Sequence, residues 1–197
     1  MTAELDGIGS RLREERRRSG LSQRELARRL GVSASLISQI ETGQSKPSVG
    51  TLYAIVTELG VSLDRLFQHA DGPADDESRG STLGPVVHPD GRQGIELDTG
   101  VTWEQLTPGP EEGIDFLHAV YDVGGASTPD ESLMRHHGRE YGFVMSGRLG
   151  IQLGFERFEL APGDSIAFDS TRPHRLFNIG DEPVHAVWFV VGRDSGS

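Results

Sequence analysis

The residues best equipped for chemistry lie in the stretch MRHHGREY at positions 134–141. His136 and Glu140 are an even number of positions apart, so they project from the same face of a regular β-strand. A turn at Gly138 would disturb that count. An imidazole and a carboxylate on one face are ligands for Fe(II), Mn, Ni or Zn, and without a metal they hydrogen-bond a polar molecule. His137 falls on the opposite face and is expected to be exposed or structural.

Charge is divided unevenly along the chain. The formal net charge of −11 argues against a nucleic-acid partner, because affinity for phosphate comes from cations. Residues 1–69, however, carry ten Lys and Arg against eight Asp and Glu, whereas residues 70–197 carry nine against twenty-two. This asymmetry predicts two domains with different partners, the first of them basic.

The composition argues against membrane and disulfide-rich classes. No apolar run approaches the roughly 18 residues that a membrane helix needs, and the first residues show no signal-peptide core. The sequence has no cysteine, so it has neither a disulfide framework nor a thiolate metal site. We therefore expect a cytoplasmic protein with no membrane partner.

The first 69 residues predict a bundle of five short helices, because apolar residues recur at three- and four-residue spacings. The expected segments are RLREERRR (11–18), RELARRL (24–30), ASLISQIE (34–41), VGTLYAIVTEL (49–59) and LDRLF (63–67). Ser22, with Glu25 three positions later, forms a capping box, and Ser33 and Ser48 are further expected N-caps. Helix ends are expected at the glycines Gly20, Gly31, Gly43 and Gly60.

The rest of the chain predicts a linker followed by a β domain. Residues 70–84 are rich in Asp, Gly and Ser, which is typical of a flexible linker. From residue 85 to residue 197 the pattern alternates, and seven or more short strands predict a β-sandwich or small barrel. The expected strand segments are 95–106, 115–123, 141–154, 155–160, 165–170, 174–179 and 184–192. We expect few contacts to cross between the halves, so that residues 85–197 fold without the helices.

Residues 21–67 resemble the lambda-repressor-like helix-turn-helix family along nearly their whole length. The matching positions are Gln23, Leu26, Ala27, Leu30, Gly31, Val32, Ile37, Ile40, Glu41, Gly43, Pro47, Leu52, Leu59, Gly60, Val61, Ser62 and Leu66. The resemblance implies that the second helix of the motif lies in the major groove of double-stranded DNA. It also implies a structural ion pair between Arg16 and Glu41.

The helix at 34–41 is the expected reading helix. Ile37 and Ile40 share one face and pack inward, so the other face is free to meet base edges. The expected DNA-contacting residues are Ser33, Ala34, Ser35, Ser38 and Gln39 and, at phosphates by the resemblance, Gln23, Thr42, Gln44 and Lys46. Most of these side chains are short, so backbone contacts would carry much of the affinity. A related fold that no longer binds DNA is the alternative.

The second half resembles the cupin superfamily. Glu140-Tyr141-x-Phe143-Val144-Met145-x-Gly147 fits the family's first motif, and Pro162-Gly163-Asp164 through Pro173-His174 to Asn178 fits its second. The resemblance implies a double-stranded β-helix, or jelly-roll barrel, for residues 85–197. Trp103, Phe143, Phe168, Phe177 and Trp188 are then expected mostly in the core, and His118 and His185 have no expected site role.

The cupin resemblance also implies a metal site. Metal-binding cupins take two histidines and a glutamate from the first motif and one histidine from the second. Aligned on Glu140, the first histidine falls at Met134, so this sequence departs from the family at one ligand. His136, Glu140 and His174 remain as ligands for Fe, Mn, Ni or Zn, in an effector pocket that Met134 also lines. A metal-free pocket with the same residues is the alternative.

Together the resemblances imply a transcriptional regulator whose cupin domain binds a small-molecule effector and forms a homodimer on its operator DNA. The alternative is a mononuclear non-haem iron enzyme resembling hydroxypropylphosphonate epoxidase, which shares the domain order and lacks the same histidine. Those enzymes use a lysine from the helical domain and tyrosines near the metal. Here the lysine position falls at Gly20 and residues 101–106 contain no tyrosine, so we expect a regulator and not an enzyme.

Overall fold

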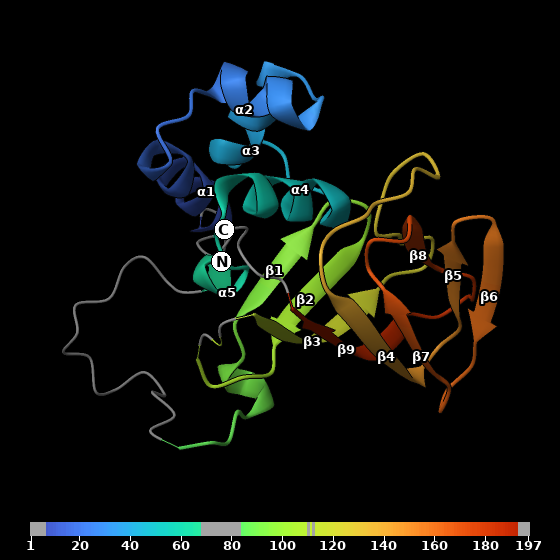
Figure 1. Cartoon of the computed structure of the whole chain (residues 1–197). Helices are drawn as coiled ribbons and strands as arrows, with labels where there is room; N and C mark the ends of the chain where they lie inside the picture. The colour runs from blue at the N-terminus through green and yellow to red at the C-terminus, as the bar shows by residue number, and fades with distance from the viewer. Residues whose placement is uncertain (1–6, 68–83, 110, 112, 193–197) are drawn as a thin grey trace.

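A computed structural model describes residues 7–67, 84–109, 111 and 113–192 (Figure 1). A helical half is followed by a half built of strands, which confirms the expected architecture of a bundle and a barrel. The expected linker at 70–84 lies outside the described residues, apart from Gly84.

Five helices in the described part of the chain form the N-terminal bundle. They are α1 (Gly7–Arg18), α2 (Gln23–Leu30), α3 (Ala34–Glu41), α4 (Val49–Leu59) and α5 (Asp64–Phe67). Ser22, Ser33 and Ser48 each accept a hydrogen bond from the backbone N–H three residues later, so the three expected N-caps are confirmed. Gly31 and Gly60 take the left-handed conformation that ends α2 and α4. No helix within the described ranges is long and apolar enough to cross a membrane.

A buried ion pair ties α1 to the end of α3. Arg16 donates to the two carboxylate oxygens of Glu41 at 2.5 and 2.9 Å, and the Gln23 amide donates to the same carboxylate at 2.8 Å. Burial opposes ionisation of Glu41, yet these hydrogen bonds hold the pKa of its carboxyl group below the usual range. The expected pairing of Arg16 with Glu41 is confirmed.

Within residues 84–192, as far as the structure describes them, nine strands form the barrel in two sheets. They are β1 (Gly94–Leu97), β2 (Val101–Gln105), β3 (Ile114–Tyr121), β4 (Arg139–Ser146), β5 (Leu149–Leu153), β6 (Glu156–Leu160), β7 (Ser165–Asp169), β8 (His174–Asn178) and β9 (Val184–Val191). One sheet has the order β1-β2-β3-β9-β4-β7 and the other the order β6-β5-β8. Alternate residues of β3 and β9 are buried, as expected for strands with one face on a core. A short 3-10 helix (Pro89–Gly91) precedes β1.

The segment 95–106 is a hairpin and not the single strand that its alternation predicted. β1 and β2 pair along their whole length and are antiparallel. Thr99 and Gly100, between them, have φ values of 66° and 68°, in the left-handed region that tight hairpin turns use. The single-strand prediction failed because a threonine in this conformation is not a recognisable turn signal.

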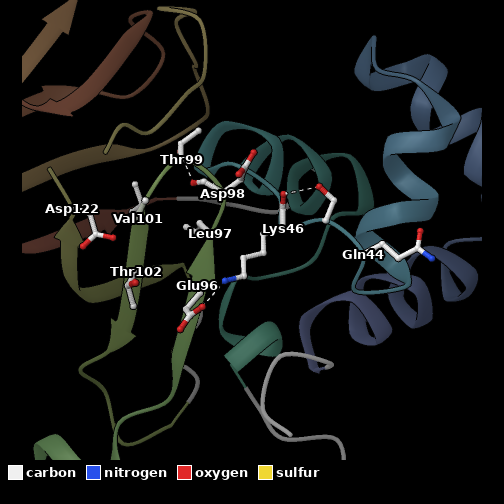
Figure 2. Close-up of a pocket in the computed structure, with 11 residues that line it drawn as sticks. Gln44, Lys46, Glu96, Leu97, Asp98, Thr99, Val101, Thr102 and Asp122 are labelled. Carbon is white, nitrogen blue, oxygen red and sulfur yellow. Dashed lines mark hydrogen bonds and ion pairs between the residues drawn. The ribbon is translucent and has the colours of Figure 1, made fainter. Parts of the chain in front are cut away.

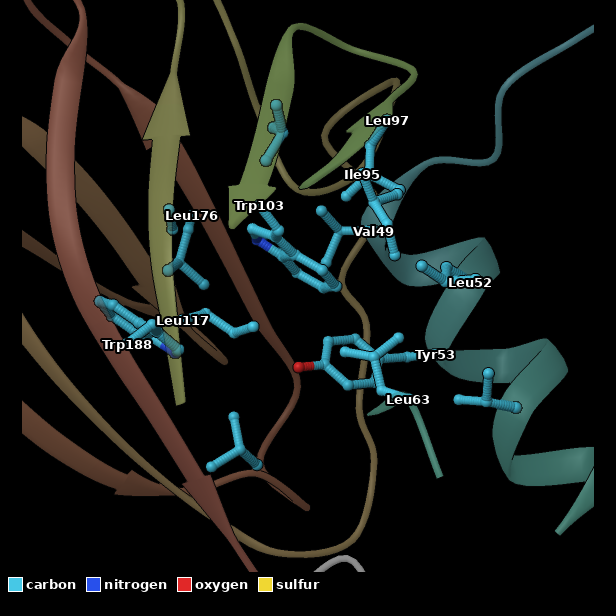
Figure 3. Close-up of a cluster of buried hydrophobic side chains, with 14 of the residues drawn as sticks. Val49, Leu52, Tyr53, Leu63, Ile95, Leu97, Trp103, Leu117, Leu176 and Trp188 are labelled. Carbon is cyan, nitrogen blue, oxygen red and sulfur yellow. The ribbon is translucent and has the colours of Figure 1, made fainter. Parts of the chain in front are cut away.

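Helix α4 packs against the barrel as well as against the bundle. One hydrophobic cluster runs through both halves of the described structure. The residues that meet at the boundary are Val49, Leu52 and Tyr53 of α4 and Ile95, Leu97 and Trp103 of the β1–β2 hairpin (Figure 3). The two halves therefore meet along this side of α4, and independent folding of residues 85–197 stays a prediction. Linker composition carries no information about the faces that the two halves present to each other.

Two backbone hydrogen bonds reinforce this boundary. The N–H of Gly50, in the first turn of α4, donates to the carbonyl of Ser127 at 3.1 Å, and the N–H of Asp98 donates to the carbonyl of Pro47 at 2.9 Å. Backbone bonds of this kind fix position more closely than apolar contact alone, because they are directional. These bonds therefore fix the position of the bundle relative to the barrel.

Replacing Arg16 by alanine should destabilise the bundle strongly, because it leaves Glu41 buried without its cation. We expect the free energy of unfolding to fall by about 3–5 kcal/mol in urea denaturation followed by circular dichroism. Arg28→Ala is the control, since it removes an ion pair with Glu25 on the exposed surface of α2 and should change that free energy by less than about 1 kcal/mol. Equal effects of the two substitutions would contradict this account of the buried pair.

Candidate functional site

His136, Glu140 and His174, called the triad below, come together where the two sheets meet. Glu140 is the second residue of β4 in the larger sheet, and His174 begins β8 in the smaller one. Met134 forms an isolated antiparallel bridge with His174, which brings the 134–137 segment beside β8. His136 then lies opposite Glu140, with Gly138 at a φ of 113° between them.

The three side chains converge closely and are almost completely buried. Nε2 of His136 and Nε2 of His174 each lie 3.1 Å from Oε1 of Glu140. Within the described part of the chain, this is the one group of three metal-ligating side chains whose ligand atoms all lie within 4.8 Å of one another. The structure therefore brings together the residues that the sequence singled out.

Backbone carbonyls decide which imidazole nitrogens carry protons. Nδ1 of His136 lies 3.0 Å from the carbonyl oxygen of His137, and Nδ1 of His174 lies 2.8 Å from that of Arg172. A carbonyl oxygen only accepts, so Nδ1 donates in both rings, and in the neutral tautomer Nε2 holds a lone pair. Nε2 of both rings and Oε1 of Glu140 have no hydrogen-bond partner of acceptable geometry. With both rings neutral, three acceptor atoms thus face one another inside the barrel.

The second oxygen of Glu140 is held by a tryptophan. Nε1 of Trp188 donates to Oε2 of Glu140 at 2.7 Å. The indole lies against Gly142, where a Cβ atom would come within 2.0 Å of the ring. Sequence reasoning missed both residues in this role, although a glycine inside a strand is a recognised sign of close packing. Trp188, expected in the core, therefore also orients a residue of the triad.

Burial and the charges within the triad shift the pKa values of its residues in opposite directions. Burial penalises an ionised Glu140, yet the two imidazoles hold the pKa of its carboxyl group well below the usual range. Burial likewise penalises a charged His174, yet the Glu140 carboxylate beside it gives a net rise in the pKa of its imidazole. The carboxylate is therefore ionised, and the site attracts positive charge.

Tyr53 of α4 closes one side of this site. Its ring stacks on that of His136, with centroids 4.2 Å apart and planes at 19°, and it meets the edge of Trp103 at 5.3 Å. Sequence reasoning missed Tyr53, because no local pattern connects a helix of the bundle with a histidine more than 80 positions later.

The other candidate residues of the barrel lie around the triad or away from it. His137 is exposed, as expected, and Met134 is half-buried at the boundary with α4. His118 and His185 lie outside the triad, in a chain in which Glu104 contacts His118 at 2.9 Å and His118 contacts His185 at 3.2 Å.

The expected DNA-contacting residues gather around α3. Ser33, Ser35, Gln39, Thr42 and Gln44 are exposed, and Gln23, Ala34, Ser38 and Lys46 are half-buried. Two of them bond to other parts of the chain, because Gln23 donates to Glu41 and Lys46 forms an ion pair with Glu96 of β1 (Figure 2). The Ser33 hydroxyl caps α3.

A polar cavity of about 580 Å³ lies between the loop that carries Lys46 and the β1–β2 hairpin (Figure 2). Its lining contains three acidic residues, Glu96, Asp98 and Asp122, and Lys46 is the one basic residue among them. No residue of the triad lines it. This cavity is therefore distinct from the effector pocket expected around the triad.

Comparison with known proteins agrees with both halves of this description. Residues 12–66 match the helix-turn-helix family profile, and residues 117–190 match that of the cupin domain. The HTH-type transcriptional regulator PuuR of Escherichia coli is 28% identical over 172 residues, which cover 86% of each chain. The uncharacterized HTH-type transcriptional regulator y4dJ of Sinorhizobium fredii is 42% identical over 64 residues, which are 32% of this chain and 83% of that one.

A solved structure has the same arrangement of domains. The crystal structure of an HTH_3 family transcriptional regulator from Vibrio cholerae superposes with a TM-score of 0.66 at 24% sequence identity, covering 96% of this chain and 97% of the other. The fold is thus shared along nearly the whole length. The chain belongs to the helix-turn-helix transcriptional regulators and joins that DNA-binding domain to a cupin domain.

Proposed function

We propose that this regulator binds a palindromic operator as a homodimer and senses a small molecule through a divalent metal held by His136, Glu140 and His174. The observation that carries the metal is the meeting of three buried ligand atoms, one from each residue of the triad, none of which has a hydrogen-bond partner. Buried polar atoms without partners are costly, and a cation that accepts all three lone pairs removes that cost.

The atoms around the triad support a metal in particular. Metal-binding histidines usually donate their other ring N–H to a carbonyl or carboxylate, as both imidazoles do here. Two histidines and one carboxylate suit Fe(II), Mn, Ni or Zn and leave coordination positions open. A small molecule with an oxygen or nitrogen donor would occupy those positions, and a bound metal would supply the charge that attracts it.

The relatives support a regulator over the epoxidase alternative. The two curated relatives compared above carry the names of transcriptional regulators. The exposed side of α3 would contact the DNA. Ser35 and Gln39 would face base edges, and Thr42 and Gln44 would contact phosphates. A dimer would present two such helices to half-sites about one turn of DNA apart.

The outer face of the larger sheet supports dimerisation through the cupin domain. Phe143, which was expected in the core, is 46% exposed on β4, and its neighbours Tyr141 and Met145 are 42% and 45% exposed. These alternate residues share one face, and Tyr141 adjoins Phe189 of β9 on it. A second copy of the chain that covers this face would bury apolar surface otherwise left in water.

Metal binding is tested by titrating the protein with Ni²⁺ in a calorimeter. We expect one ion per chain, and His174→Ala should weaken its binding at least about 100-fold because a ligand is lost. His137→Ala is the matched control, since it removes an exposed histidine beside the site and should leave the affinity within about twofold. Equal Ni²⁺ affinity in the wild type and in His174→Ala would contradict the proposed site.

DNA binding is tested on a duplex selected from random sequences by the full-length protein. Glu96→Gln should raise its affinity about two- to fivefold at low salt, because Lys46 loses its exposed partner and is free to meet a phosphate. The gain should shrink as salt screens the charges. Glu159→Gln is the control, since it makes the same charge change in an exposed pair on β6. Equal gains from both variants would indicate a net-charge effect and contradict the role of Lys46.

Dimerisation is tested by sedimentation. Phe143→Glu should shift the full chain toward monomer at concentrations where the wild type is a dimer, because a carboxylate would be buried at the interface. Phe155→Glu, at a fully exposed phenylalanine between β5 and β6, should leave the dimer intact. A wild-type protein that sediments as a monomer, or a dimer unaffected by Phe143→Glu, would contradict the proposed face.

A further inference from the structure

The DNA-binding domain supplies a wall of the candidate metal site. Tyr53 lies in the middle of α4, is 3% exposed, and reaches from the helix toward the barrel beside Trp103 (Figure 3). Its ring covers a face of the His136 imidazole, whose Nε2 points at Glu140. The imidazole is thus held by its Nδ1 hydrogen bond and, across its plane, by a residue of the other domain.

Helix α4 is seated so closely on the barrel that Tyr53 has little freedom to move alone. A Cβ atom at Gly50 would lie 2.9 Å from Cγ2 of Thr128 and 3.4 Å from Cβ of Met134, so the helix backbone approaches the 127–134 segment directly. The hydrogen bond from Gly50 to Ser127 fixes the same turn. A shift of the 127–134 segment, which leads to His136, therefore acts on α4 through backbone as well as through Tyr53.

The opposite side of α4 belongs to the bundle. The helix packs against α1 and α2, and Ile55, Val56 and Leu59 are buried with the bundle's other apolar residues. The α2–α3 unit in turn carries the expected DNA-contacting residues. Because close-packed interiors transmit displacement, a change at His136 has a continuous route of contacts to the reading helix.

We propose that the site is shared between the two domains, and that Tyr53 couples its occupancy to the DNA-binding helices. This inference rests on the proposed metal site. A metal held by the triad would fix the His136 ring through Nε2, and the Tyr53 ring would then stack on a side chain that no longer reorients. Occupancy of the site would then stabilise the bundle as well as the barrel. A ligand that rotates the His136 ring would weaken the packing of α4 against the barrel.

The experiment is hydrogen exchange of the full-length protein with and without Ni²⁺, measured by mass spectrometry. A ligand at about 100 times its dissociation constant slows exchange by about 100-fold for amides that exchange through unfolding of the unit that binds it. In the wild type we expect this protection in the barrel and at least about fivefold slower exchange in α1, α2 and α4. In Tyr53→Leu, protection should remain in the barrel and fall below about twofold in the helices.

Two variants isolate the contribution of the ring. Tyr53→Phe keeps the aromatic ring stacked on His136, so Ni²⁺ should slow hydrogen exchange in its helices as much as in the wild type. Glu96→Gln removes the ion pair between β1 and Lys46 without touching the triad, and should also leave transmission unchanged. If Tyr53→Leu does not fold, Tyr53→Met replaces it with the same two outcomes, because methionine fills irregular apolar gaps.

The outcomes separate this inference from the proposed metal site. Barrel protection in the wild type without helix protection, or helix protection that persists in Tyr53→Leu, would overturn the coupling and leave the metal site standing. If Glu96→Gln also abolishes the Ni²⁺-dependent protection of the helices, the coupling depends on the domain boundary as a whole. That result would overturn the specific role of Tyr53. Absence of any Ni²⁺ protection would overturn the metal site and the coupling with it.

Discussion

A carboxylate held between two imidazoles, out of contact with water, is the arrangement on which the barrel's interior depends. Glu140 stays ionised there because His136 and His174 face it, while a backbone carbonyl accepts a hydrogen bond from Nδ1–H of each ring. Neither histidine can turn away without giving up that bond to a carbonyl. The order of the site is therefore set by ordinary peptide groups at positions 137 and 172, which no change of side chain at those positions removes directly.

The supporting structure follows from that requirement. Glycine at position 142 leaves room for the Trp188 indole, and the indole N–H satisfies the Glu140 oxygen that the histidines do not reach. The bridge between Met134 and His174 holds the segment that leads to His136 beside β8 of the smaller sheet. Met134, at the position where the cupin resemblance implies another histidine, packs instead beside Gly50 of the DNA-binding domain.

Local chemistry explains why much of this could be read from the sequence. Serine caps, glycine stops and three-to-four-residue periodicity act over a few positions, so the bounds of α3 and α4 matched the predicted segments residue for residue. Convergence of the triad was also foreseen, although through resemblance to a family and not through spacing alone. The irregular backbone at Gly138 shows why spacing was insufficient, since His136 lies outside β4 and still faces Glu140.

What the sequence did not show depends on contacts between distant segments. Alternation in β4 says which residues share a face, but not that Phe143 lies on the outer one. Periodicity in α4 identifies one apolar stripe, whereas the helix is buried on two sides. Tyr53 and His136 meet only because the two halves of the chain pack against each other. Such contacts produce no local sequence pattern, since the sequence around each of the two residues is equally compatible with an ordinary core position.

The ion pair between Lys46 and Glu96 has a consequence for the protein's covalent chemistry. Lys46 is the only lysine in the sequence, so it is the only side-chain amine that can be acylated. Acylation would remove its positive charge and, with it, an electrostatic link between the two domains. In most proteins a lysine-directed modification is spread over many surface positions. Here it falls on a single atom, Nζ, beside a cavity with three carboxylates, so one acyl group would alter the charge balance of the boundary between domains.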